Sequence, residues 1–211
     1  VLHGHINTSG ITSELFYKLL YKRYKKSNFV ACSNECAEYY LNQFNIKCKV
    51  ILNGTSCSGA KEKHYQDKKD FIVGMISNLD EHKGFKYFLE AAVILCKKYN
   101  HVKFYIAGTN SENFNFDDFI QNNKLSSSIK YFGEVEDAAN TLLPKIDLLV
   151  LPSVMEGLPM SLIEAQCYGI PILATKVGGI PELLVNGYNG YFIKRDIADI
   201  VSKVELCLDE N

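Results

Sequence analysis

The stretch DLLVLPSVMEGLPMSLIE, residues 147–164, decides the fold of this chain. Its apolar run Leu148–Leu151 predicts a buried strand, and a helix is predicted to begin near Met160–Ser161. The loop between strand and helix contains Glu156, Gly157, Leu158 and Pro159. Junctions of this kind are where open α/β sheets bind ligands, and the free amides and dipole of a helix start favour an anion. The stretch therefore predicts an anion site flanked by two carboxylates, Glu156 and Glu164.

From residue 71 onward, short apolar runs alternate with segments of helical period. Strands are expected at 71–76, 102–107, 129–132, 148–151, 171–174 and 190–193. Helices or helical connections are expected at 84–99, 112–123, 137–143, 161–168, 181–184 and 196–208. Regular alternation of strands and helices is typical of a parallel sheet covered on both faces. The sequence therefore predicts an α/β fold with a Rossmann-like parallel sheet.

The first part of the chain shows the same alternation on a smaller scale. We expect a helix at 11–26, a strand at 29–32, a helix capped by Ser33 or Asn34 that runs to 42, and a strand at 49–52. The stretch 55–70 is polar and has no apolar period, which indicates an interdomain linker. The predicted domains are an incomplete first lobe at 1–54, a linker at 55–68 and a main domain at 69–211.

Composition and charge exclude several classes of protein. The chain has 211 residues with a formal net charge of -1, so it carries no general electrostatic attraction for nucleic acid or anionic membranes. No apolar run approaches the roughly 18 residues of a membrane span. The seven cysteines are an odd number without metal-ligand spacing. We therefore expect reduced, buried thiols and a reducing compartment rather than disulfides.

Two candidate residues also have structural interpretations. Ser161 and Glu164 fit the S-x-x-E capping box, in which the glutamate bonds back to the cap amide, so Glu164 is either a cap or a ligand. Lys83 follows the first strand of the main domain, where it could reach a phosphate, and Gly84 allows close backbone approach. The alternative is a solvated lysine at a helix start.

The remaining candidates are weaker. His3 and His5 flank a glycine in residues 1–10, which are interpreted as a strand end running into a polar loop, so a site residue is one interpretation and a surface histidine the other. Residues 178–182, GGIPE, are interpreted as a tight turn and a helix start with proline in its first turn. The sequence has no D-x-D pair, nucleophile elbow, P-loop or dinucleotide fingerprint, and no metal site is predicted.

Taken together, several stretches resemble one family. Residues 152–193, PSVMEGLPMSLIEAQCYGIPILATKVGGIPELLVNGYNGYFI, closely resemble the donor-binding domain of GT-B glycosyltransferases of family 4. The combination of E-x7-E, from Glu156 to Glu164, with G-x-P and GGIPE carries the likeness. Residues 74–92 resemble the family's first strand, phosphate-contact lysine and first helix, and 29–41 and 49–56 resemble the end of its N-terminal lobe.

The resemblance implies a role for each matched position. Glu164 would bond the ribose hydroxyls, Glu156 would contact the donor sugar, and Lys83 would neutralise the diphosphate. His3 would be the active-site histidine beside the sugar. The family usually has an arginine where Asn78 stands, which leaves phosphate stabilisation to Lys83 and the helix start. The remaining donor-binding positions would be Gly84, Gly157, Leu158, Pro159, Met160 and Ser161.

The implied activity is transfer of a sugar, with retention, from a nucleotide diphosphate sugar to a hydroxyl acceptor in glycan or polysaccharide biosynthesis. UDP-sugars are the expected donors, no cofactor is expected, and the acceptor would be a glycan, a lipid-linked species or a small molecule. The expected location is the cytoplasm, with peripheral contact at the inner face of the membrane through the missing part of the first lobe. Two alternatives stay open: a nucleotide-sugar binding module that is inactive without that part, and a sugar-nucleotide epimerase of the same fold.

Overall fold

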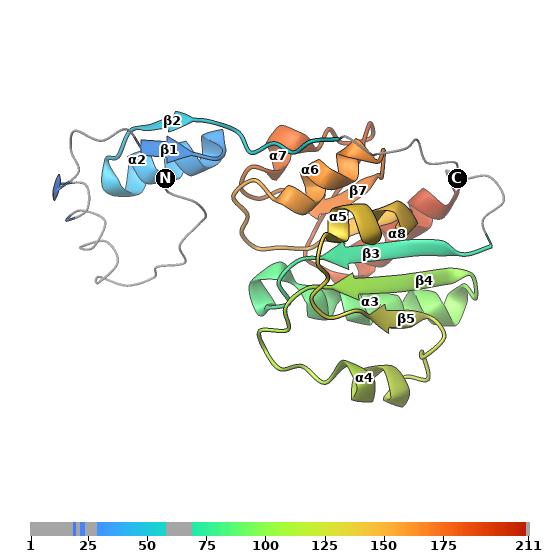
Figure 1. Ribbon diagram of the computed structural model, residues 1–211. Helices are drawn as coiled ribbons and strands as arrows, with labels where there is room; N and C mark the ends of the chain where they lie inside the picture. Colours follow the sequence, from blue (N-terminus) through green and yellow to red (C-terminus); the bar gives the residue numbers. More distant parts are fainter. Residues whose placement is uncertain (1–18, 20–21, 24–28, 58–68, 210–211) are drawn as a thin grey trace.

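The computed structural model describes residues 19, 22–23, 29–57 and 69–209, and Figure 1 shows their arrangement. His3, His5 and most of the helix expected at 11–26 lie outside these residues. Among the described residues, no helix combines the length and the apolar character needed to cross a membrane. The boundaries proposed for the two lobes and the linker stay a prediction.

Residues 29–50 form a small parallel βαβ unit, which we call the first-lobe unit. Its strands β1 (Phe29–Ala31) and β2 (Cys48–Val50) pair in parallel on either side of helix α2 (Asn34–Phe44) in the chain. Ser33 caps α2 as predicted, because its hydroxyl accepts a hydrogen bond of 3.1 Å from the backbone N–H of Cys36. The prediction of strand, capped helix and strand is therefore confirmed, with bounds that differ by one or two residues.

The main domain is built on one six-stranded sheet, in which every pairing is parallel. Its strands are β3 (Phe71–Ile76), β4 (Val102–Ala107), β5 (Ile129–Tyr131), β6 (Leu148–Leu151), β7 (Ile172–Thr175) and β8 (Gly190–Ile193). Their order across the sheet is β5-β4-β3-β6-β7-β8. The predicted fold class and all six predicted strands are confirmed, because buried parallel strands leave near-continuous apolar runs in the sequence.

Helices cover both faces of this sheet. They are α3 (Phe85–Lys98), α4 (Phe116–Asn122), α5 (Ala138–Thr141), α6 (Met160–Cys167), α7 (Ile180–Leu183) and α8 (Ile197–Asp209), with 3-10 turns η1 (Glu81–Lys83) and η2 (Leu143–Lys145). Helices α3 and α8 pack against each other behind the sheet, whereas α5 and α6 pack against each other in front of it (Figure 1). The buried side chains between these layers form one continuous core.

The strand order creates a topological switch point. From β3 the chain moves through α3 to β4 on one side, and from β6 it moves through α6 to β7 on the other side. Strands β3 and β6 are neighbours, so the loops that leave their carboxyl ends diverge around a crevice. The fold therefore places the loop after β3 opposite the loop that carries Glu156.

The expectation of reduced thiols throughout is wrong. Cys57 and Cys167 form a disulfide with a Cα–Cα distance of 5.2 Å, across 110 residues of sequence. The chain leaving β2 runs past α6, and this contact cannot be seen in cysteine spacing. The other cysteines, Cys32, Cys36, Cys48, Cys96 and Cys207, do not take part in a disulfide.

The disulfide predicts a stability difference between oxidised and reduced protein. Closing a loop of this length stabilises a fold by about 2–4 kcal/mol. We expect reductant to lower the denaturant midpoint of the wild type, and Cys57→Ser to lower it equally without reductant. Cys48→Ser, which removes a free thiol, should still respond to reductant like the wild type. A reductant-insensitive wild type would contradict the disulfide.

Candidate functional site

The candidate site, here called the switch-point site, lies at the carboxyl ends of β3 and β6. One wall is the segment 77–84, which follows β3 and includes the 3-10 turn η1. The other is the segment 152–159, which follows β6 and leads into α6. Ligands of open α/β sheets bind in this position because the diverging loops leave a crevice there.

Lys83 is held in place at the end of η1. Its backbone N–H donates to the Asp80 carboxylate at 3.0 Å, so the start of the turn is capped. Gly84 follows with a φ of 73°, in the left-handed region that favours glycine. A side chain at Gly84 would overlap the carbonyl oxygen of Pro152, so the two walls of the site are in direct backbone contact here. The glycine after the lysine is therefore required by both backbone conformation and close approach.

The structure brings Lys83 and Glu156 together. The Lys83 ammonium lies 2.8 Å from both carboxylate oxygens of Glu156. The Glu156 side chain is only 5% exposed, whereas 24% of the Lys83 side chain remains accessible. A buried carboxylate needs such a partner, because an uncompensated charge in the interior is costly. The pair thus offers a ligand a partly accessible ammonium backed by a buried carboxylate.

Two hydroxyl groups support Glu156 from behind. Ser153 Oγ donates to Glu156 Oε1 at 2.7 Å, and Ser153 is itself buried. Thr175 at the end of β7 donates its hydroxyl to the Ser153 carbonyl. The carboxylate is therefore fixed directly by Lys83 and Ser153, and Ser153 is in turn held by Thr175 of β7, which preorganises the carboxylate before any ligand binds. Sequence analysis missed Ser153 and Thr175, although Ser153 precedes Glu156 by only three residues.

Helix α6 begins two residues earlier than a capping box at Ser161 would require. Pro159 is the N-cap residue, with φ -68° and ψ 125°, and no side chain caps the helix start. Ser161 already lies within the helix, so the capping-box interpretation of Ser161 and Glu164 is wrong. Proline fixes the extended residue at 159 and thereby sets the start at Met160. The first amides of α6 are left for another acceptor, as an anion-binding helix start requires.

The predicted donor-binding segment 157–161 is divided between two environments. The Gly157 carbonyl accepts a hydrogen bond of 2.6 Å from Gly179 N–H, and Leu158 is buried. The Leu158 side chain packs against the first-lobe unit rather than into the crevice. Met160 is 38% exposed at the helix start. Of this segment, the α6 start and the Gly157 backbone lie nearest to the switch-point site, and Leu158 faces away from it.

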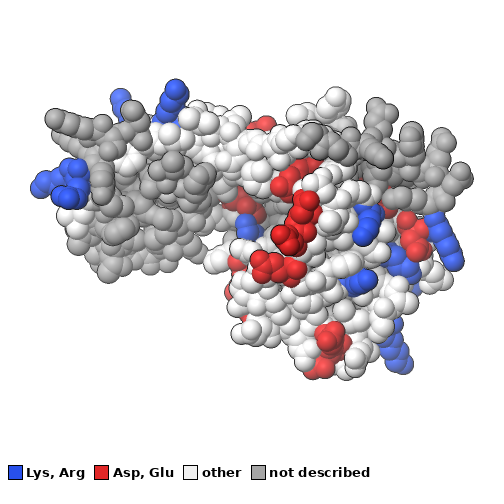
Figure 2. Space-filling view, viewed as in Figure 1, with Lys and Arg blue, Asp and Glu red and all other residues white. Residues whose placement is uncertain are grey.

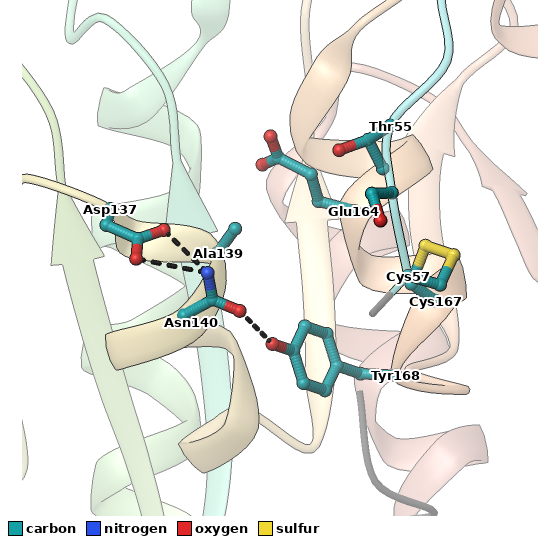
Figure 3. Close-up of a pocket in the computed structure, with 9 residues that line it drawn as sticks. Thr55, Cys57, Asp137, Ala139, Asn140, Glu164, Cys167 and Tyr168 are labelled. Carbon is teal, nitrogen blue, oxygen red and sulfur yellow. Dashed lines mark hydrogen bonds between the residues drawn. A yellow bond between two sulfur atoms is a disulfide. The ribbon is translucent and has the colours of Figure 1, made fainter. Parts of the chain in front are cut away.

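Glu164 lies on α6 and lines a separate pocket of about 160 Å³ between α5 and α6 (Figure 3). On the other side of this pocket, Asn140 connects Asp137 to Tyr168. Its side-chain amide donates to both Asp137 carboxylate oxygens at 3.0 Å and accepts a hydrogen bond of 2.8 Å from the Tyr168 hydroxyl. Burial raises the pKa of the Glu164 carboxyl, and the nearby charge of Asp137 raises it further. Hydrogen-bond donors from a ligand would relieve this desolvation. The remaining lining residues are Thr55, Ser56, Cys57, Ala139 and Cys167.

The surface around this second pocket is acidic. Figure 2 shows Asp and Glu side chains gathered over the middle of the face that carries α5. The segment leading into α5 contributes three exposed acidic residues, Glu134, Glu136 and Asp137. The Glu164 pocket thus has acidic surroundings, whereas the switch-point site presents the Lys83 ammonium.

Two of the predicted site residues add nothing to this geometry. Asn78 is exposed in the turn between β3 and η1, and its predicted phosphate contact stays a prediction. His3 lies outside the described residues. Within the described part of the chain, no group of three or more His, Cys, Asp or Glu side chains is placed to hold a metal ion.

Comparison with known proteins supplies the family. A model of the family described as "Glycosyl transferases group 1" matches residues 59–211. The chain belongs to this glycosyltransferase family. A curated relative is the N,N'-diacetylbacillosaminyl-diphospho-undecaprenol alpha-1,3-N-acetylgalactosaminyltransferase of Campylobacter jejuni. It is 34% identical over 145 residues, which are 68% of this chain and 37% of the relative.

A second relative is the phosphatidylinositol N-acetylglucosaminyltransferase GPI3 subunit of Saccharomyces cerevisiae, 27% identical over 94% of this chain and 47% of the relative. The chain thus spans less than half the length of these two curated relatives. The family assignment confirms the resemblance seen in the sequence.

Solved structures agree on the fold. An S. aureus TarM mutant in complex with Fondaparinux, alpha-GlcNAc-glycerol and UDP matches with a TM-score of 0.79 and 24% identity, over 99% of this chain and 42% of that one. Anabaena Alr3699/HepE in complex with UDP-glucose matches with a TM-score of 0.78 and 20% identity, over 94% of this chain and 59% of that one. The GT-B type fold is confirmed by these likenesses.

The Lys83–Glu156 pair makes a testable prediction about stability. Lys83→Met should leave the Glu156 carboxylate buried with Ser153 as its remaining partner in this network, and should lower the free energy of unfolding by about 1–3 kcal/mol. Glu156→Gln in that background should recover part of the loss, because a neutral amide is less costly to bury. Denaturant midpoints of the wild type, both single variants and the double variant give the coupling energy. Strict additivity would mean that the two side chains do not interact.

Proposed function

We propose that this chain binds a nucleotide diphosphate sugar across the switch-point site and the Glu164 pocket. The proposal is carried by one observation: a partly accessible lysine, backed by a buried carboxylate, faces the crevice beside an uncapped helix start. Lys83 and the α6 amides bind the diphosphate, Glu156 bonds the donor sugar, and Glu164 bonds the ribose hydroxyls.

The donor set suits a departing diphosphate. An ammonium group has three N–H donors, and its contacts with Glu156 leave a donor for a phosphate oxygen. Negative charge on the diphosphate grows as the sugar bond breaks, so a preorganised cation and helix dipole stabilise the transition state more than the ground state. These groups supply the positive charge from the chain itself. We therefore propose a reaction without a cofactor.

The charge pattern supports one orientation of the nucleotide. A diphosphate at the α5 end would meet the exposed carboxylates that precede α5, whereas ribose hydroxyls can donate hydrogen bonds to an acidic group. The phosphates therefore lie at Lys83 and the ribose at Glu164. The Glu156 carboxylate, fixed by Ser153, is left to accept hydrogen bonds from hydroxyls of the sugar.

The whole protein would transfer that sugar, with retention, to a hydroxyl on a glycan, a lipid-linked species or a small molecule. The names of the two curated relatives specify N-acetylgalactosaminyl and N-acetylglucosaminyl transfer, and two similar structures are described with UDP or UDP-glucose. A UDP-sugar is therefore the proposed donor. The proposed location is the cytoplasm, with a peripheral membrane contact where the acceptor is a lipid.

A binding panel tests the proposed donor. We expect UDP and a UDP-sugar to raise the melting temperature more than GDP, ADP or uridine alone. At 100 times its dissociation constant a ligand adds about 2.7 kcal/mol of stability. Uridine alone should bind weakly, because it lacks the diphosphate that Lys83 contacts. Equal shifts with UDP and uridine would contradict a phosphate site at Lys83.

Glu164 predicts a pH dependence of nucleotide affinity. Glu164→Gln should weaken UDP binding roughly tenfold at neutral pH, because hydrogen bonds to a charged acceptor are among the stronger ones. Burial raises the pKa of Glu164 in the free protein, and ribose hydroxyls would lower it again. The advantage of the wild type over Glu164→Gln in UDP affinity is therefore present above this pKa and lost as the pH falls through it. Protonation of UDP itself affects both proteins alike, so calorimetric affinities are compared as a ratio.

A constant ratio of the two affinities from neutral to acidic pH would remove Glu164 from the binding site. Glu112→Gln is a suitable control, because Glu112 pairs with Lys86 on the surface and does not line the Glu164 pocket. Its UDP affinity should follow that of the wild type at every pH.

Asn78→Arg tests the phosphate end of the site. The guanidinium can bond two phosphate oxygens, so UDP should bind more tightly, with little change for uridine. Lys83→Ala should lower turnover more than it raises KM, roughly 10²–10³-fold, if the ammonium acts in the transition state. UDP affinity and kinetics at wild-type levels in both variants would show that neither residue meets the diphosphate.

A further inference from the structure

The loop that carries Glu156 is enclosed by two segments from distant parts of the chain. On one side lies the turn between β1 and α2 in the first-lobe unit, and on the other lies the GGIPE segment, residues 178–182, before and within α7. The proposed donor chemistry does not use either segment. Their contacts with each other and with the loop show what they do.

Glu182 joins α7 to the start of α2. Its carboxylate accepts a hydrogen bond of 2.7 Å from the backbone N–H of Asn34 and another of 2.6 Å from the Asn34 side-chain amide. Asn34 is the first residue of α2, where the helix dipole favours a negative charge. The two residues are 148 positions apart in sequence, so this bidentate contact closes the main domain onto the first-lobe unit.

Leu158 fills the interior of the same contact. It is 4% exposed and packs with Ala31, Cys32 and Cys36 of the first-lobe unit. Its carbonyl also accepts a hydrogen bond of 3.0 Å from the Asn53 side chain. A residue only two positions after Glu156 is thus buried against the other lobe.

The glycines of the GGIPE segment hold the opposite side of the loop. Gly178 has a φ of 55°, and a side chain there would overlap the carbonyl of Glu156. A side chain at Gly179 would lie 2.7 Å from both Leu158 Cδ1 and Ser33 Cβ. Only glycine allows the segment to approach both the Glu156 loop and the α2 cap this closely, so the three pack directly against one another.

We propose that this three-way contact, here called the clamp, positions Glu156. The Glu182 carboxylate joins the two lobes by hydrogen bonds to Asn34, and the Leu158 side chain fills the interior of the contact. Contact of the first lobe with Glu182 and Leu158 holds the backbone on both sides of Glu156, so that the Glu156 carboxylate stays next to the Lys83 ammonium. Glu182 is therefore a positioning residue that acts through the loop rather than on the donor. The inference rests on the proposed function for its consequence in catalysis, although the clamp itself can be tested without activity.

Two buried thiols report on the clamp. Cys32 and Cys36 lie under Leu158 at 5% and 2% exposure, and burial raises the pKa of the Cys36 thiol to about 11. Their alkylation, located by peptide mass spectrometry, should be slow in the wild-type chain. Glu182→Ala should accelerate it roughly threefold to tenfold, because a charged acceptor is lost from an exposed contact. Leu158→Ala should accelerate the alkylation roughly tenfold or more, because the substitution removes the buried side chain that covers the two thiols.

Internal controls separate opening of the clamp from unfolding. Cys96 and Cys207 are buried in the core of the main domain, and their alkylation should not change in Glu182→Ala. Glu205→Ala removes a carboxylate that bonds Lys98 at 2.6 Å far from the clamp, and should behave as the wild type. Unchanged alkylation of Cys32 and Cys36 in both clamp variants would overturn the clamp.

Hydrogen exchange and kinetics test the positioning of Glu156. Exchange of the peptide covering 154–158 should increase in Glu182→Ala and not in Glu205→Ala. In the transferase with its acceptor lobe, Glu182→Ala should lower kcat severalfold while the Kd for UDP stays within about twofold, because the Glu164 pocket is untouched. Faster alkylation without faster exchange at 154–158 would show a lobe contact that does not position Glu156. Lack of UDP binding by the wild type would overturn the proposed function. The alkylation and exchange rates would still show whether the clamp exists, because neither measurement depends on UDP.

Discussion

The contact between Lys83 and Glu156 is the interaction on which the arrangement of the site depends. A carboxylate that is 5% exposed at the end of β6 requires a cation, and the nearest element that can provide one is the turn after β3. Because β3 and β6 are neighbours whose connections leave in opposite directions, the pair spans the crevice between them. Charge pairing and strand topology thus specify the same location for ligand binding.

Much of the fold is visible in the sequence. Buried parallel strands such as Leu148–Leu151 are short and uniformly apolar, and the segments between them have helical period, so the alternation gives the sheet and its helices. The Ser33 cap and the glycine after Lys83 could also be predicted, since their local conformations favour these residue types. The start of α6 near Met160 could be predicted as well, but its N-cap could not, because Pro159 and Ser161 both suit a helix N-terminus and local pattern alone does not choose between them.

The contacts that give the site its shape are non-local, which is why sequence analysis missed them. Lys83 and Glu156 are 73 residues apart, and Asn34 and Glu182 are 148 apart. The neighbouring positions of β3 and β6 bring Lys83 to Glu156, whereas packing of the first-lobe unit against α7 brings Asn34 to Glu182. GGIPE was predicted to be a turn and a helix start, and this is confirmed, although its two glycines also pack against the loop that carries Glu156.

The Cys57–Cys167 disulfide changes how the two parts of the chain are mechanically joined. Without it, the covalent route from β2 to the main domain runs through residues 58–70. With it, a second covalent route passes directly from Cys57 to the end of α6. Proteolytic cleavage between residues 58 and 70 would then leave the two parts connected for as long as the disulfide is intact. The short segment between β2 and Cys57 thereby limits how far the first-lobe unit and the main domain can separate.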